Sequence, residues 1–203
     1  RAFPSVSKYS VAVKYLENRG ITRDSIKRFN IRYAPKGRMA GRVVLPIRSD
    51  KGRIVSYVGR TIRGETPKTR KQGSKGSTLY GIHELQKIGQ IWPYLVVVEG
   101  EFDAVYLQQF SIPAVAAMGS GELTKEQRIL LKRYAKKVVL AYDGDDAGEK
   151  AVYGSKGNFY SLSRYMPTIP LALPEGKDPN SLSETEVYEL FEPYRADFGG
   201  SYE

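Results

Sequence analysis

Three apolar runs in the second half of the chain each end in acidic residues. Residues 94–100 read YLVVVEG, residues 136–146 read KKVVLAYDGDD, and residues 168–178 read TIPLALPEGKD. Segments with helical spacing separate these runs, and strands that alternate with helices indicate βαβ units and a parallel sheet. The runs are apolar throughout, which is typical of strands covered on both faces. The pattern therefore predicts an α/β unit with a central, mostly parallel sheet.

The segments between these runs are expected to be helices or a further strand. EFDAVYLQQF (residues 101–110) has helical spacing, and PAVAA (residues 113–117) is a short strand before a glycine turn. Thr124 is a candidate N-cap for a helix over residues 124–135. Residues 146–165 are predicted to form one long helix.

The first half of the chain has a different pattern. SVAVKYLENRG predicts a helix closed by Gly20, and ITRDSIKRF predicts a second short helix with Thr22 as its N-cap. Two β-rich runs over residues 42–62, joined by the turn DKGR, predict a hairpin. Residues 63–78 are polar, basic and rich in Gly, Ser, Thr and Pro, which favours a mobile surface loop.

The charge is divided unequally between the two halves. Residues 1–90 contain 21 Lys and Arg but only 5 Asp and Glu, whereas residues 91–203 contain 11 and 17. Such a basic half suggests contact with a polyanion, and the asymmetry favours nucleic acid over an ordinary solvated surface.

Composition excludes several classes of protein. The chain has no Cys and a single histidine, His83, so it offers neither a disulfide framework nor a Cys-based zinc site, and almost nothing for a Ser-His triad. No apolar run approaches the roughly 20 residues of a membrane helix, and no signal peptide is recognisable. A cytoplasmic protein with no membrane contact is expected.

The acids fall where a parallel sheet binds its ligands, beyond the carboxyl ends of the strands. If the three strands are neighbours, their acids converge on one edge: Glu99, Asp103, Asp143, Asp145 and Asp178. Clustered carboxylates repel one another unless a cation neutralises them, and oxygen ligands suit Mg²⁺ or Mn²⁺. Each acid alone could simply stabilise a helix start, and this is the role expected of Asp146.

The motifs VVVEGEFDA, AMGSG, VVLAYDGDDAGEKA and LPEGKDPNSL together resemble the Toprim domain, the metal-binding module shared by DnaG-type primases, type IA and type II topoisomerases and some nucleases. LPEGKDP points to the primases within this superfamily. RVVLPIRSDKGRIVSYVGRTI, TPKT, KGSTLYGIHEL and YLENRGITRDSIKRFNIRYAP are similar to segments of the primase core. The resemblance covers about residues 9–182, in the right order.

The resemblance implies a Toprim domain with a mostly parallel sheet, preceded by a basic α+β subdomain. It divides the chain into residues 1–90, 91–175 and 176–203, the last being an acidic loop and a short helix. It implies that the five acids above bind metal, with Glu99, Asp143 and Asp145 catalytic. It also implies that five basic residues bind nucleic acid or nucleotide: Arg42, Arg48, Arg60, Lys68 and Lys75.

The implied activity is that of a DNA primase, a nucleotidyltransferase that synthesises RNA primers. It requires single-stranded DNA, ribonucleoside triphosphates and Mg²⁺ or Mn²⁺, without zinc. Tyr57 and Tyr80 could stack on bases, although most of the 15 tyrosines are expected to pack half-buried.

The chain also departs from the family pattern. The zinc-ribbon and helicase-binding domains of the family have no counterpart in this sequence, and SYVGR and TRKQGS replace more typical segments. This suggests an isolated core, or a minimal primase that works with a replicative helicase and a separate template-recognition protein. Two alternatives stay open at this point: a Toprim nuclease, and a nucleic-acid-binding module without catalysis.

Overall fold

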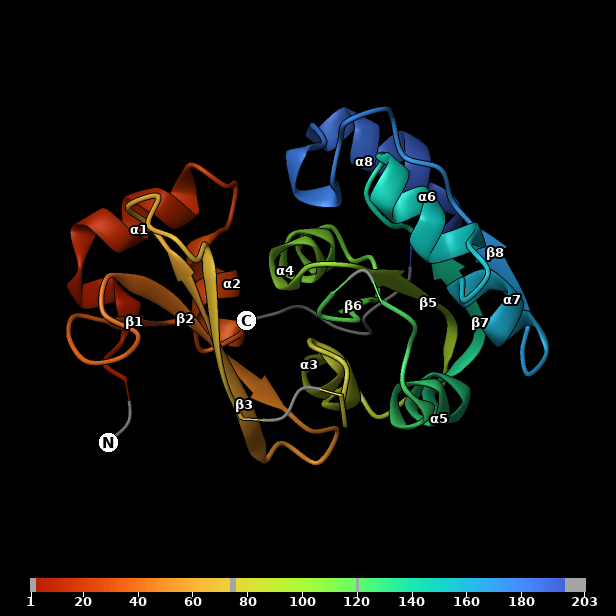
Figure 1. The fold of residues 1–203 in the computed structure, drawn as a ribbon, viewed down its shortest axis with the longest axis horizontal. Helices are drawn as coiled ribbons and strands as arrows, with labels where there is room; N and C mark the ends of the chain where they lie inside the picture. Colours follow the sequence, from red (N-terminus) through yellow and green to blue (C-terminus); the bar gives the residue numbers. More distant parts are fainter. Residues whose placement is uncertain (1–2, 74–75, 120, 196–203) are drawn as a thin grey trace.

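The structure, a computed structural model, describes residues 3–73, 76–119 and 121–195. Two four-stranded sheets organise the chain, one in each of the two lobes that Figure 1 shows on its left and right. Within the described ranges no helix is both long and apolar enough to cross a membrane.

The first sheet is antiparallel throughout, with the strand order β1-β2-β3-β4. Its strands are β1 (Arg32–Ala34), β2 (Arg42–Arg48), β3 (Ile54–Thr61) and β4 (Thr69–Gly73). The hairpin predicted over residues 42–62 is confirmed as β2 and β3, and Arg42 lies opposite Thr61.

The prediction of a mobile loop over residues 63–78 is wrong where β4 forms, while residues 74–75 lie outside the described residues. Strand β4 reads TRKQG and pairs with β3 from Thr69 opposite Arg60 to Gly73 opposite Ser56. It has no apolar side chain and is half-buried or exposed along its length, so it shows no alternating hydrophobic pattern. Backbone pairing at the edge of a sheet does not require such a pattern.

Two helices cover this sheet and begin as predicted. Helix α1 (Ser10–Glu17) ends before a turn that Gly20 closes at a φ of 69°. Helix α2 (Arg23–Arg28) is capped by the Thr22 hydroxyl, which accepts a hydrogen bond from the Ser25 N–H at 3.2 Å. The short helices η1 (Val6–Lys8) and α3 (Ile82–Gln86) precede and follow these elements.

The second sheet is parallel, as predicted, with the order β6-β5-β7-β8. Its strands are β5 (Trp92–Val98), β6 (Ala114–Ala116), β7 (Ala135–Leu140) and β8 (Thr168–Pro170). Strands β5, β7 and β8 are direct neighbours, so the three acid-bearing strand ends meet at one edge of the sheet.

Both faces of this sheet are buried at β6 and at the last residues of β5 and β7, which explains their continuous apolar runs, whereas the edge strand β8 is only half-buried. Val96, Val98 and Val139 pack into the core cluster shared with the first lobe, whereas their neighbours Val97 and Val138 pack into a second cluster. Helix α4 (Glu101–Gln109) lies between the two lobes in Figure 1. Helix α5 (Lys125–Tyr134) contributes to the second cluster and starts at a capping box in which Thr124 accepts from the Gln127 N–H.

The single long helix predicted over residues 146–165 is wrong. The structure has α6 (Asp146–Tyr153) and α7 (Asn158–Ser163), separated by the sequence GSKG. Gly154 leaves the helical conformation with a ψ of 172°, and a Cβ atom on Gly157 would lie 2.3 Å from the Val152 carbonyl oxygen. The chain turns too tightly here for a helix to continue.

The last elements lie against helix α4 and strand β5. They are η2 (Pro179–Ser181), α8 (Glu184–Phe191) and η3 (Glu192–Tyr194). The Ser183 hydroxyl caps α8 by accepting from the Glu186 N–H. The Tyr106 hydroxyl of α4 donates a hydrogen bond to the Leu182 carbonyl at 2.7 Å and so anchors this segment.

The division near residue 90 falls between the last strand of the first sheet and the first strand of the second. The lobes nevertheless share a core. Residues that precede the division, among them Leu79, Ile82 and Leu85, pack with Leu95 in the second cluster, and Tyr80 bridges to Ala116 next to β5.

Candidate active site

Backbone hydrogen bonds join two of the three acid-bearing segments, and the third follows the neighbouring strand β5. Glu99 follows the last residue of β5, and Asp143 follows β7 after two buried residues. The Gly144 N–H donates to the Lys177 carbonyl at 2.8 Å, and the Gly176 N–H donates to the Gly144 carbonyl at 2.7 Å. These two bonds hold the loop that carries Asp178 beside the loop that carries Asp143.

Two glycines make this close approach possible. A Cβ atom on Gly144 would lie 2.2 Å from the Pro174 carbonyl oxygen, and one on Gly148 would lie 2.0 Å from the Asp143 carbonyl oxygen. Neither distance can accommodate a side chain without moving backbone. The glycines of the DGDDAG stretch are therefore required by the path of the loop itself.

Asp103 is the most buried acid of the set, with 6% of its surface exposed. Its Oδ2 accepts from the Gly100 N–H at 3.0 Å, and its Oδ1 accepts from the Asn180 N–H at 3.3 Å. Burial, followed by the charges of Asp178 and Asp143, raises its pKa well above the ordinary value in spite of these bonds. Asp103 thereby joins the start of α4 to the loop that follows Asp178.

Glu99 and Asp143 carry raised pKa values because they are partly buried beside other carboxylates. Burial, Asp143 and Asp145 raise the pKa of Glu99 to about 7. Burial, Asp178 and Asp145 raise the pKa of Asp143 to about 6. Four of the five predicted acids, Glu99, Asp103, Asp143 and Asp178, lie around one cavity, and the exposed Asp145 is close enough for its charge to act on Glu99 and Asp143. Asp145 also caps α6 by accepting from the Gly148 N–H at 2.7 Å.

The donor set fits a divalent cation. Asp143 Oδ1 and Asp178 Oδ1 are buried acceptors without a hydrogen-bond partner, which is costly unless a positive charge lies nearby. In the part of the chain that the structure describes, no group of three or more His, Cys, Asp or Glu side chains forms a ready-made metal cage. Mg²⁺ binds few carboxylates and completes its shell with water and phosphate, so such an open arrangement suits it.

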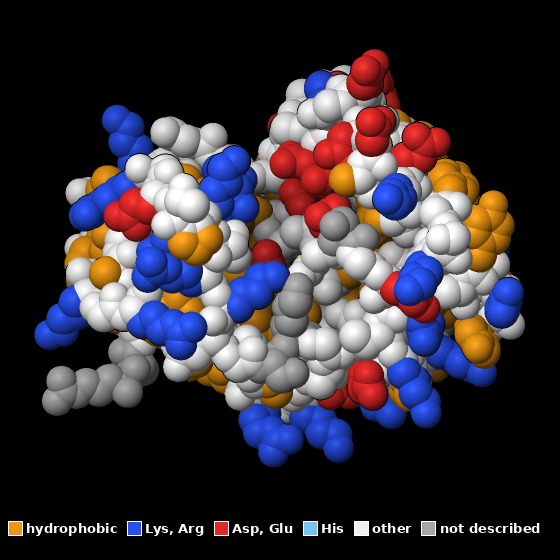
Figure 2. Space-filling view, in the orientation of Figure 1, with side chains coloured by type: hydrophobic (Ala, Val, Ile, Leu, Met, Phe, Trp, Pro, Cys, Tyr) orange, Lys and Arg blue, Asp and Glu red, His pale blue; other side chains and the backbone are white. Residues whose placement is uncertain are grey.

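A cavity of about 220 Å³ joins the acids to the basic lobe. Glu99, Asp103, Asp143 and Asp178 line it from one side, and Arg60 and Thr69, which face each other on β3 and β4, line it from the other. Figure 2 shows Asp and Glu gathered beside a hollow, with Lys and Arg across it on the left-hand lobe.

Two charged residues of this cavity, Arg19 and Glu101, are not among those predicted from the sequence. The Arg19 guanidinium lies 5.2 Å from the Phe102 ring centroid and donates to Asn180 Oδ1 at 3.0 Å. Glu101 has a buried Oε1 without a hydrogen-bond partner. Both belong to stretches that carry the resemblance, ENRG and EGEFD, but only the fold brings Arg19 to the acids.

The predicted basic residues are placed unequally. Arg60 lines the cavity, and Lys68 is exposed just before β4. Arg48 is half-buried and donates to the Gly52 carbonyl at 2.7 Å. Lys75 lies outside the described residues.

Arg42 does not face the cleft as expected. Only 1% of it is exposed, and its guanidinium donates to the Ala40 and Pro67 carbonyls at 3.1 Å and 3.0 Å and pairs with Glu65 at 3.3 Å. It is buried because the loop between β3 and β4 folds over it. Its observed role is to hold that loop in place.

The two tyrosines considered for base stacking also differ. Tyr80 is 2% exposed and stacks on Phe29 with ring centroids 5.7 Å apart, so its ring is not available to a base. Tyr57 is half-buried, and its ring meets that of Phe3 edge-on at 5.2 Å.

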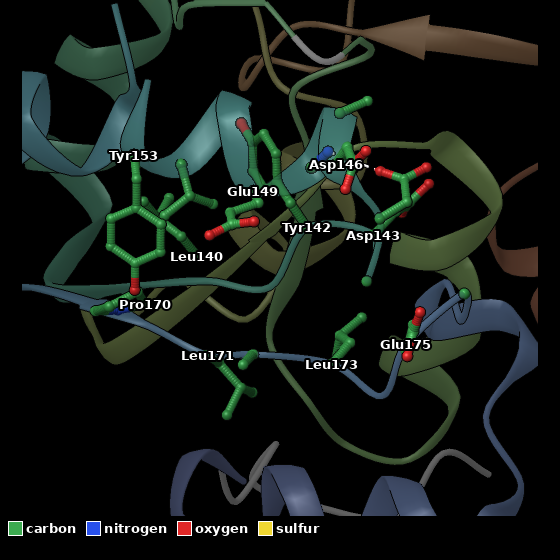
Figure 3. A pocket seen from close by; sticks show the side chains of 17 residues that line it. Leu140, Tyr142, Asp143, Asp146, Glu149, Tyr153, Pro170, Leu171, Leu173 and Glu175 are labelled. Carbon is green, nitrogen blue, oxygen red and sulfur yellow. Dashed lines mark hydrogen bonds between the residues drawn. The ribbon is translucent and has the colours of Figure 1, made fainter. Parts of the chain in front are cut away.

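A larger pocket of about 840 Å³ adjoins the same loop (Figure 3). Leu140 and Tyr142 come from β7 and the residues after it, Asp146 and Glu149 from α6, and Leu171 from the segment after β8. Asp143 borders both this pocket and the smaller cavity.

Known proteins share this fold and these motifs. A Toprim-like family model matches residues 96–183. The DNA primase of Clostridium acetobutylicum is 30% identical over 227 residues, which cover 93% of this chain and 38% of that protein. The DNA primase of Thermotoga maritima is 32% identical over 188 residues, covering 87% of this chain and 33% of that protein.

Two solved structures are similar over nearly the whole chain. One, of the DnaG catalytic core, has a TM-score of 0.82 and 30% identity, and the match covers 94% of this chain and 74% of that one. The chain belongs to the family of DnaG-type primase catalytic cores. The other solved primase core, a DnaG catalytic domain bound to ssDNA, has a TM-score of 0.80 and 30% identity, with 94% and 73% covered.

Family membership confirms the resemblance and the α/β Toprim fold predicted from the sequence. This primase core spans between a third and two fifths of the length of the two curated relatives.

Proposed function

We propose that this chain synthesises short RNA primers on single-stranded DNA by metal-dependent nucleotidyl transfer. A 3′-hydroxyl attacks the α-phosphate of a ribonucleoside triphosphate, and pyrophosphate leaves. The observation that carries the proposal is the cavity in which acids from three strand ends face Arg19 and Arg60. The relatives named DNA primase support it.

The acids would hold Mg²⁺ or Mn²⁺, and no zinc is part of the proposal. Asp143 and Asp178 are the first ligands we assign because each has a buried oxygen without a hydrogen-bond partner. Glu99 and Asp145 complete the set from neighbouring loops, and Asp103 supports it from α4. A bound divalent cation would neutralise charge on phosphate oxygens and favour ionisation of the attacking hydroxyl.

Each side of the cavity has its own task. Arg60 and Arg19 would bind phosphate oxygens of the nucleotide or template, since a guanidinium can contact phosphate through two parallel hydrogen bonds. Lys68, which precedes Thr69 of the lining, would add positive charge nearby, whereas a role for Arg48 at the β2–β3 hairpin is proposed on the resemblance alone. Glu99, with a pKa of about 7, can hold a proton on its carboxylate near neutral pH and release it when a cation arrives.

The proposed partners follow from the family. The template is single-stranded DNA, the ligand bound to the DnaG catalytic domain of one solved relative. A replicative helicase and a separate template-recognition protein are proposed on the resemblance alone, and so is a cytoplasmic location.

The decisive experiment is primer synthesis on single-stranded DNA with labelled ribonucleotides and Mg²⁺ or Mn²⁺. The unaltered chain should give short RNA products, and Asp143→Ala/Asp145→Ala should give none. Asp146→Ala is the matched control, because this neighbouring acid is exposed at the first position of α6 and should leave synthesis intact.

Failure of the unaltered chain to extend even an annealed primer would refute the proposal. Mg²⁺-dependent degradation of nucleic acid without added triphosphates would then identify a Toprim nuclease. Binding that is unaffected by Asp143→Ala/Asp145→Ala, with neither synthesis nor cleavage, would identify a passive binding module.

A further inference from the structure

A second large groove lies on the first lobe, away from the strand ends that carry the acids. It has a volume of about 1040 Å³ and is bordered by η1, α1, α2 and β1, which belong to the left-hand lobe of Figure 1. Ile26 and Ile31 are the buried residues of its lining, and polar side chains make up most of the remainder.

The groove is strongly positive. Five of its lining residues are cationic, and only one is acidic: Lys8, Lys14, Arg23, Lys27 and Arg32 against Glu17. Glu17 pairs with Arg23 at 3.3 Å. In the described ranges, the side chains of Lys8, Lys14, Lys27 and Arg32 make no hydrogen bond or ion pair. Four cations along one groove without counter-charges form a field that attracts a polyanion.

The uncharged lining indicates which part of a polyanion would bind. Ser5, Ser7, Asn18 and Asn30 supply hydroxyl and amide groups of the kind that contact phosphate and sugar. The described lining contains no Phe, Tyr or Trp on which a base could stack. Such a surface suits the nucleic-acid backbone better than its bases.

The groove and the active-site cavity lie on different faces of the end of helix α1. Arg19 lines that cavity with the acids, and the preceding residue, Asn18, lines the groove. The residues just after helix α1 therefore contribute to both linings, Asn18 to the groove and Arg19 to the cavity. A nucleic-acid strand that passes Arg19 can reach the groove around the end of α1 without meeting an unpaired acid of this helix. Glu17 is the only acid in α1, and it pairs with Arg23.

We propose that this groove is a second nucleic-acid site, which binds the phosphodiester backbone of a single strand where it extends beyond the active-site cavity. This extends the proposed function and rests on it for the identity of the strand as template. The groove contributes affinity without reading sequence, so it lengthens the stretch of strand that the chain holds.

The test compares Lys14→Gln/Lys27→Gln with the unaltered chain in binding single-stranded DNA. Both lysines are exposed and their replacement should leave the fold intact, which a melting curve verifies. Fluorescence anisotropy in EDTA, over a salt series and with strands of increasing length, gives the slope of log K against log salt. On long strands the slope should become shallower by ~1.4, because each lost phosphate contact accounts for about 0.7 on single strands. Strands too short to leave the cavity should bind both proteins alike.

Lys132→Gln/Lys136→Gln is the matched control, since it removes the same charge from exposed positions on the second lobe. Equal changes in slope for the two double variants, or no change for the groove variant, would overturn the proposal. Polyglutamate binding gives a second check. If the groove variant lost affinity for polyglutamate but bound DNA unchanged, the proposal would also be overturned, because the groove would then bind an acidic polypeptide.

The outcome is independent of catalysis. Binding is measured without divalent metal, and Asp143→Ala/Asp145→Ala should keep the same dependence on strand length. Absence of primer synthesis would therefore refute the proposed activity while leaving the groove measurement interpretable.

Discussion

The two four-stranded sheets of this chain differ in where they carry their charged residues. The antiparallel sheet of the first lobe ends in the basic edge strand β4, which is half-buried or exposed, whereas the central strands β5 and β7 of the parallel sheet pack into a core cluster on each face and carry acidic side chains just beyond their carboxyl ends. An exposed edge strand can present charge along the border of a sheet. A covered sheet concentrates charge at one edge, where loops from neighbouring strands meet.

This contrast predicts that backbone changes at the ends of the parallel strands have larger effects than charge changes on the antiparallel sheet. Gly148→Ala is expected to have the largest effect, because its Cβ would lie 2.0 Å from the Asp143 carbonyl oxygen. Primer synthesis should fall at least ~100-fold, since a shift of about 1 Å in a catalytic group can cost that much. Stability should fall by about 1–3 kcal/mol.

Gly121→Ala provides the control for that prediction, since a Cβ there meets no atom within 4 Å. It should change neither primer synthesis nor the melting temperature appreciably. Full activity of Gly148→Ala would contradict the prediction, because the loop after β7 would then accommodate a Cβ atom without displacing Asp143.

Two arginines on the same sheet should separate stability from binding. Arg42→Met should lower the free energy of unfolding by about 1–3 kcal/mol, because it removes hydrogen bonds that hold the loop before β4. Arg60→Met should leave stability nearly unchanged but weaken nucleotide or DNA binding, because Arg60 lines the cavity. Denaturant unfolding and anisotropy measure the two effects, and a reversed pattern would contradict the assignment.

The smallest expected effect concerns pH and metal. The pKa of Glu99 is raised to about 7 from an ordinary 4.5, so the folded chain binds a proton more tightly than the unfolded one. The resulting contribution is fully present below pH 4.5 and is lost as the pH rises through 7. Asp143, raised to about 6, acts in the same direction.

Without metal, the melting temperature should therefore decline by a few degrees across this range, about 1 kcal/mol being equivalent to roughly 2–4 °C for a chain of this size. Mg²⁺ should restore it above pH 7 but not at pH 4.5. Asp143→Asn should reduce both effects. An equal effect of Mg²⁺ at both ends of the range would show that these carboxylates do not bind it.

Much of the second lobe could be predicted from the sequence because its signals are local. The apolar runs identify the buried strands, Thr124 and Thr22 identify helix starts, and the position of each acid after a run identifies the functional edge. The helix break at GSKG was missed although its glycines are visible, because residues on either side continue the helical pattern.

The rest depended on contacts between distant residues. Strand β4 has no hydrophobic alternation and exists only because β3 offers a backbone to pair with. Arg42 and Arg60 are the same residue type, yet Arg42 is buried under a loop and Arg60 faces the acids. Arg19, far from the acids in sequence, reaches them because the two lobes share a core.

The sequence by itself determined the kind of sheet, the edge at which carboxylates collect and the family, because periodicity and motif spacing are properties of neighbouring residues. Only the tertiary structure decided which cations face those carboxylates and which are used to hold the fold. Burial and hydrogen bonding depend on what packs against a side chain, and residues far apart in the chain supply that packing.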